Sequence, residues 1–175
     1  MILAEKLNKK IKEKNLSQLK LAKMIDYDDA GLNAMILGKR PISEYVFERI
    51  IPILEISADE INSWILADKY SKEVLKLALK TKRSSKMDCQ PIKKILTMKL
   101  DEILQSKNLS RTALSKLTGN SQSGLNRAIT GKETLSKKLM KKISTVLEIP
   151  ENEIQSWVIA DKYPLKVLEL AVNIE

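Results

Sequence analysis

The chain carries one nine-residue stretch twice, as GLNAMILGK at residues 31–39 and as GLNRAITGK at residues 124–132. When residues 2–82 are aligned with residues 95–175 without gaps, 33 of the 81 pairs are identical. Chance would give roughly one identity in fifteen pairs for this composition. A unit of about 80 residues is long enough to fold alone and too long for a solenoid repeat. The sequence therefore predicts a duplicated domain, with copies at 1–81 and 93–175 and a polar linker at 82–92.

Apolar residues recur within each copy at the spacing of an α-helix. Leu3, Leu7 and Ile11 form one stripe, which Leu96, Leu100 and Leu104 repeat in the second copy. Serines precede several of the predicted helices as N-caps, at 17, 43, 110 and 136, and Gly38 and Gly131 are placed to end the third helix of each copy. Pro52 lies inside the first copy of the fourth helix, which we expect it to kink or shorten. No segment alternates with a period of two, so we predict an all-α protein with five to six helices in each domain.

Composition excludes several classes of function. The 175 residues include no histidine and a single cysteine, so the commonest general base and any zinc site built from several cysteines are missing. No apolar run reaches the roughly 20 residues that a membrane helix needs. We therefore expect a cytoplasmic protein that is not an enzyme, has no cofactor and binds no metal or membrane. The formal charge of +9 favours a polyanionic partner.

The third helix of the second copy has two chemically distinct faces. Leu125, Ala128 and Ile129 fall on one side and are expected in the core, as are Trp64 and Trp157 further along each copy. The opposite face consists of side chains that can form hydrogen bonds: Gln122, Ser123, Asn126, Arg127 and Thr130. Gln and Asn can pair bidentately with adenine and Arg with guanine, and a helix fits the major groove of DNA. This face predicts a helix that reads bases.

Residues 108–148 resemble the helix-turn-helix domain of lambda-repressor-like regulators of the Cro and XRE type. The resemblance rests on the stretch NLSR at 108–111, the turn at Gly119-Asn120, and Gln122, Leu125 and Gly131 in and after the third helix. It implies two tandem helix-turn-helix domains. It further implies that Gln122, Ser123, Asn126 and Arg127 approach bases, whereas Arg111, Lys132, Lys137 and Lys138 hold phosphates. Arg111 departs from the family pattern, because many members carry glutamine there.

Charge separates the two copies. Residues 108–143 hold eight basic residues and one acidic residue, a net charge of +7, whereas the equivalent residues 15–50 hold five of each, a net charge of 0. Asp28 and Asp29 would face phosphates with the wrong sign, and Ala30, Ala34 and Leu37 resemble a surface for a protein. We expect the second copy to be the main DNA reader and the first to pair with another copy of the chain or with a partner. A rival geometry uses both copies on DNA, with a second site at Gln18, Asn33, Lys39 and Arg40.

These patterns favour sequence-specific binding of double-stranded DNA by a transcription regulator, such as a repressor. The alternative is a protein-interaction module that uses the same fold, such as an antirepressor, an antitoxin or an inhibitor of a nucleic-acid enzyme.

Overall fold

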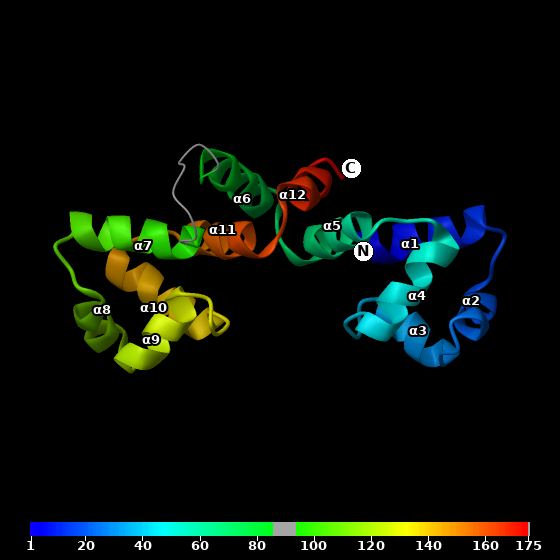
Figure 1. The fold of residues 1–175 in the computed structure, drawn as a ribbon, viewed down its shortest axis with the longest axis horizontal. Coiled ribbons are helices and arrows are strands. Elements are labelled where there is room, and N and C mark those ends of the chain that lie inside the picture. Colours follow the sequence, from blue (N-terminus) through cyan, green and yellow to red (C-terminus); the bar gives the residue numbers. More distant parts are fainter. Residues whose placement is uncertain (86–93, 175) are drawn as a thin grey trace. The chain divides into compact units, whose positions relative to one another are not determined.

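The computed structural model describes residues 1–85 and 94–174. Within these residues the secondary structure is entirely helical, which confirms the predicted all-α class (Figure 1). The twelve described helices are α1 (Ile2–Glu13), α2 (Gln18–Met24), α3 (Asp29–Ile36), α4 (Glu44–Leu54), α5 (Ala58–Lys69), α6 (Lys72–Ser85), α7 (Ile95–Ser106), α8 (Arg111–Thr118), α9 (Gln122–Ile129), α10 (Lys137–Leu147), α11 (Glu151–Lys162) and α12 (Leu165–Val172).

Contacts between helices group the chain into two compact units. Unit 1 comprises Met1–Ser71 with Glu169–Glu175, and unit 2 comprises Lys72–Leu168. This grouping differs from the expected division at 82–92, because α6 packs on α11 within unit 2. Its apolar residues Val74, Leu75 and Ala78 are buried. Most of the expected linker lies outside the described residues.

The first five helices and α7–α11 agree in order and nearly in length. The helices α1, α5, α7 and α11 have 12 residues each, α3 and α9 have 8, and α4 and α10 have 11. The expected serine caps are present, since Ser17, Ser43, Ser110 and Ser136 each accept a backbone N–H of the helix that follows. Such a cap typically contributes about 1 kcal/mol to the helix.

Pro52 was expected to kink or shorten α4, and the helix is not shortened. The helix reaches Leu54 and has the same 11 residues as α10, which contains no proline. Pro52 is the ninth residue of the helix and its side chain is exposed. The proline therefore removes one backbone hydrogen bond close to the C-terminal end, where few further bonds depend on it.

Each unit encloses its own apolar core. In unit 2 the inner faces of the helices supply the buried side chains Leu96, Leu100, Leu104, Leu114, Leu125, Ile129, Leu139, Ile143, Leu147, Ile154 and Trp157. Unit 1 buries the corresponding set, and Trp64 is 7% exposed there while Trp157 is 2% exposed in unit 2. Both tryptophans are thus core residues, as predicted.

A repeated aspartate fixes the start of the first helix in both units. The carboxylate of Asp161 on α11 accepts hydrogen bonds from the backbone N–H groups of Ile95 and Leu96, at 2.7 and 3.1 Å. Asp68 on α5 does the same for Ile2 and Leu3, at 2.6 and 3.0 Å. The first N–H groups of a helix have no partner within it and attract negative charge. The aspartate is therefore a cap that reaches across from another helix.

Candidate nucleic-acid interface

Three local features determine the turn between α8 and α9. Gly119 ends α8 in the left-handed region, at φ 65°. The N–H of Asn120 then donates to the carbonyl of Ser115 at 3.0 Å. Ser121 begins α9 by accepting the N–H of Gly124 at 3.2 Å. Helix α9 thus starts immediately after the turn, in the order expected of a helix-turn-helix.

The exposed face of α9 is short and polar. Leu125 and Ile129 are fully buried and Ala128 is 4% exposed, so one side of the helix is anchored in the core of unit 2. Gln122 and Ser123 are exposed in the first turn. Within the described residues no hydrogen bond or ion pair involves either side chain, so both are available to a ligand.

Two residues expected on that face have a different environment. The hydroxyl of Thr130 donates to the carbonyl of Asn126 at 2.7 Å, so this side chain is turned back onto its own helix. Asn126 itself is partly buried, and its Oδ1 is buried without a hydrogen-bond partner in the described part of the chain. The face that is open to a partner therefore centres on the N-terminal turn of α9 and on Arg127.

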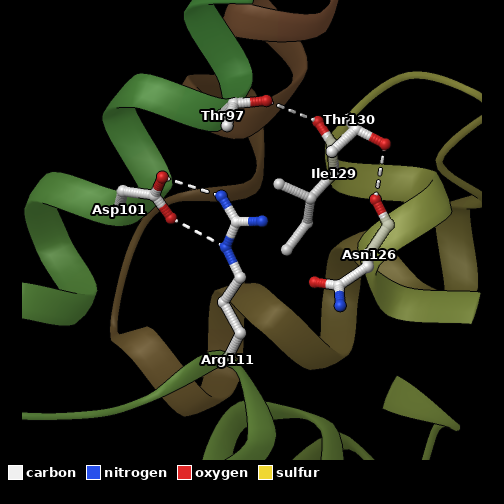
Figure 2. Close-up of polar contacts among 6 residues, drawn as sticks. All are labelled: Thr97, Asp101, Arg111, Asn126, Ile129 and Thr130. Atoms are coloured by element: carbon white, nitrogen blue, oxygen red, sulfur yellow. Dashed lines mark hydrogen bonds and ion pairs between the residues drawn. The ribbon is translucent and has the colours of Figure 1, made fainter. Parts of the chain in front are cut away.

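Arg111, expected to hold a phosphate, is paired within the protein. Figure 2 shows its guanidinium against the carboxylate of Asp101 on α7, with Nε donating to Oδ1 at 2.8 Å and Nη2 to Oδ2 at 2.7 Å. The side chains are 29% and 38% exposed. Nη1 takes no part in this pair, and in Figure 2 it points away from Asp101, toward the side of Ile129. The pair ties the start of α8 to α7.

A buried hydrogen bond holds the C-terminal end of α9. Thr97 on α7 is 8% exposed, and its hydroxyl donates to the carbonyl of Ile129 at 3.0 Å (Figure 2). In unit 1 the corresponding residue is Ala4, which has no hydroxyl. Likewise Leu37 stands where unit 2 has Thr130. The C-terminal end of α9 is therefore held by polar contacts that α3 of unit 1 lacks.

A group of lysines surrounds α9 and the start of α10. Lys132, Lys137 and Lys138, predicted as phosphate ligands, are exposed, and no ion pair in the described part of the chain involves them. Sequence reasoning assigned no role to Lys116 and Lys141, which are also exposed and line, with Lys138, a depression of about 550 Å³ between α8 and α10. The spacing of Lys137, Lys138 and Lys141 along one helix was the signal that could have identified Lys141.

One acidic residue lies within this basic region. Glu133 follows the turn after α9, and its Oε1 is 2.8 Å from Nη2 of Arg127. The side chains of Arg127 and Glu133 are 59% and 46% exposed. The pair thus lies at the solvent-facing edge of the helix, where Arg127 was expected to contact bases.

The equivalent surface of unit 1 has another character. Gln18 donates to Asn8 at 2.7 Å and Asp28 caps α3 through Gly31, whereas Asn33 is exposed. Lys39 and Arg40 are exposed after α3, as are Asp29 and Ala30 at its start, while Ala34 and Leu37 are partly buried. The large exposed apolar side chains of this unit's α2 and α4 are Leu19, Met24 and Tyr45.

No cluster of three or more His, Cys, Asp or Glu side chains among the described residues could hold a metal ion. None of the described helices combines the length and apolar character needed to cross a bilayer.

Comparison with known proteins identifies the motif in unit 2. Residues 100–154 match the model of the helix-turn-helix family, a segment that contains α8, the turn and α9. No curated protein and no solved structure matches the chain.

Proposed function

We propose that the chain binds double-stranded DNA in a sequence-dependent manner through α9 of unit 2, and that it regulates transcription by occupying its site. The observation that carries this proposal is the exposed set Gln122, Ser123 and Arg127 on a helix whose other face is buried. A solvated helix needs no such set, whereas these groups match the edges of bases in the major groove. The helix-turn-helix match over residues 100–154 supports the same function.

The proposed mechanism divides the work between two groups of side chains. Lys132, Lys137 and Lys138 attract phosphates and fix the position of the domain on the duplex, which raises affinity without reading sequence. Gln122 and Arg127 enter the groove and read base edges. The N-terminus of α9 adds a favourable field for a phosphate.

Unit 1 is proposed to contribute little to DNA affinity. Its equivalent segment has no net charge, and Asp28 and Asp29 lie at the start of α3, where unit 2 has Ser121 and Gln122. An acidic helix N-terminus repels phosphate at the point where unit 2 attracts it.

A protein partner is the second candidate for unit 1. The exposed side chains Leu19 and Tyr45 favour it, because unit 2 has Thr112 and Lys138 at these positions and DNA binding needs no apolar surface there. Another copy of the chain or a different protein would satisfy this description. A protein-interaction module without DNA binding is the corresponding alternative for the whole chain.

Selection of bound fragments from random duplex DNA, followed by titration at several salt concentrations, tests the proposal. The full chain is used, because α6 belongs to unit 2 although the linker separates it from α7 in the sequence, so a cut at the linker would divide unit 2. We expect one enriched sequence, whose affinity falls steeply as salt rises. The slope of log affinity against log salt concentration should be about −0.9 for each phosphate contact. Failure to bind any duplex in dilute buffer would favour the protein-interaction alternative.

A further inference from the structure

We infer that Glu133 sets the sequence specificity of unit 2 by holding the guanidinium of Arg127 in an ion pair until a base displaces the carboxylate. This inference rests on the proposed function and assigns a role to a residue that the function itself does not require. Glu133 is the single acidic residue among the nine charged residues between 108 and 143. On a surface that faces phosphates such a residue lowers affinity, so its position requires an explanation.

The backbone after α9 brings the two side chains together. Gly131 adopts a left-handed conformation, at φ 67°, and reverses the chain. The N–H groups of Lys132 and Glu133 then both donate to the carbonyl of Arg127, at 2.9 and 3.1 Å. The carboxylate is thereby held over the residue whose guanidinium it binds, at 2.8 Å. The turn thus places Glu133 within reach of Arg127, and the two side chains form the ion pair across it.

Unit 1 has the same turn without the pair. Gly38 has φ 66°, and the N–H groups of Lys39 and Arg40 both donate to the carbonyl of Ala34. Ala34 and Arg40 occupy the positions of Arg127 and Glu133. The fold therefore needs neither the arginine nor the glutamate, and both occur together in the unit that carries the basic surface.

The energies of the competing contacts indicate what the pair does. An exposed ion pair contributes little free energy, so a ligand can displace it. A bidentate contact from arginine to guanine is stronger than such a pair, so a guanine can release Arg127 from Glu133. A phosphate at a non-cognate site offers one charge contact, which the neighbouring carboxylate opposes. Glu133 thus weakens non-specific binding more than specific binding.

The inference predicts how Glu133→Gln changes binding of the full chain. Affinity for non-specific duplex rises roughly five- to tenfold at ~0.1 M salt, and the slope of log affinity against log salt steepens by about 0.9, because Arg127 gains a phosphate. Affinity for the selected duplex rises less, by about threefold or less, so the ratio of the two affinities falls. The matched control is Glu102→Gln, which removes the acid of another exposed pair in unit 2, with Lys99 at 2.9 Å, and leaves the ratio unchanged.

A double-mutant cycle with Arg127→Ala tests whether Glu133 acts through Arg127. In the Arg127→Ala background, Glu133→Gln raises both affinities equally and leaves their ratio constant. The inference would be overturned if Glu133→Gln alone left the ratio of specific to non-specific affinity unchanged, or if this ratio fell equally in both backgrounds. A loss of specific affinity in Glu133→Gln would also overturn it, because it would show that Glu133 reads a base itself. If the wild-type chain shows no preference for any duplex in the same titrations, the proposed function fails instead.

Discussion

Arg111 and Asp101 form a two-point ion pair that joins α8 to α7, at 2.8 and 2.7 Å. The same two positions of unit 1 hold Gln18 and Asn8, which form a neutral hydrogen bond at 2.7 Å. Both partners thus differ together between the units, and the link between the first and second helices is kept. In each unit this link ties the start of the second helix to the first helix.

The exchange of one pair for the other leads to a stability prediction. Arg111→Ala or Asp101→Ala should each destabilise unit 2 by about 1 kcal/mol, a value at the upper end for partly exposed pairs because the geometry is bidentate. The double variant Arg111→Gln with Asp101→Asn should lose less than about 0.5 kcal/mol, since it installs the pair of unit 1. Urea unfolding in a Trp64→Phe background, where Trp157 reports unit 2 alone, measures both. A double variant as unstable as the alanine variants would contradict the prediction.

The buried hydroxyl of Thr97 should stabilise the end of α9. Thr97→Ala reproduces Ala4 of unit 1 and leaves the carbonyl of Ile129 without its side-chain donor, at a cost of about 1 kcal/mol. Amide hydrogen exchange should show faster exchange in α9 and no change in α3. Thr112→Ala, at an exposed threonine of the same unit, serves as the control. Unaltered exchange in α9 would show that the hydrogen bond does not hold the helix.

Gln122 should read a base. Gln122→Ala removes an exposed side chain that makes no contact within the described residues, so folding should be unaffected. Discrimination at one position of the selected duplex should fall by about 1–3 kcal/mol, the range of a bidentate pair. Binding to a set of single-base variants of that duplex measures it. A uniform loss of affinity over all base variants would instead indicate that Gln122 contacts the phosphate backbone of the DNA.

Two equivalent ion pairs, Lys14 with Glu55 and Lys107 with Glu148, predict that the stability of each unit falls slightly at acidic pH. A hydrogen bond from Lys107 and the charge of that lysine lower the pKa of Glu148, and Lys14 lowers the pKa of Glu55 in the same way. A lowered folded pKa means that the stabilisation is present above the unfolded pKa and is lost as pH falls through the folded value. Lys107→Ala should raise the pKa of Glu148 toward its ordinary value and leave that of Glu55 unchanged, as measured by carboxyl carbon chemical shifts. Equal pKa values of Glu148 with and without Lys107 would contradict the assignment.

Local sequence features predicted much of the architecture. Helical spacing gave the order of the helices, and the serine caps and the left-handed glycines at 38, 119 and 131 marked their ends. These features depend on neighbours within a few residues, so they can be read from the chain. The buried face of α9, with Leu125 and Ile129, followed from the same periodicity.

Features that depend on distant partners were not predictable in this way. The pattern of α6 shows an apolar face but does not say which core covers it, and α11 does so in unit 2. Arg111 was expected to contact phosphate from the family resemblance, and its ion pair with Asp101 could not be predicted because Asp101 lies on another helix. Thr130 satisfies its hydroxyl on its own helix, which the periodicity of the exposed face does not reveal.

Unit 2 is proposed to read DNA through the surface around α9, and unit 1 is proposed not to do so at the equivalent place. Lys132 and Lys39 offer a matched test, because both follow the left-handed glycine that ends the third helix, and both are exposed. We predict that Lys132→Glu lowers the affinity of the full chain for its selected duplex by roughly tenfold or more at ~0.1 M salt, whereas Lys39→Glu changes it less than about twofold. Equal losses from the two substitutions, or a larger loss from Lys39→Glu, would contradict the assignment of DNA binding to unit 2.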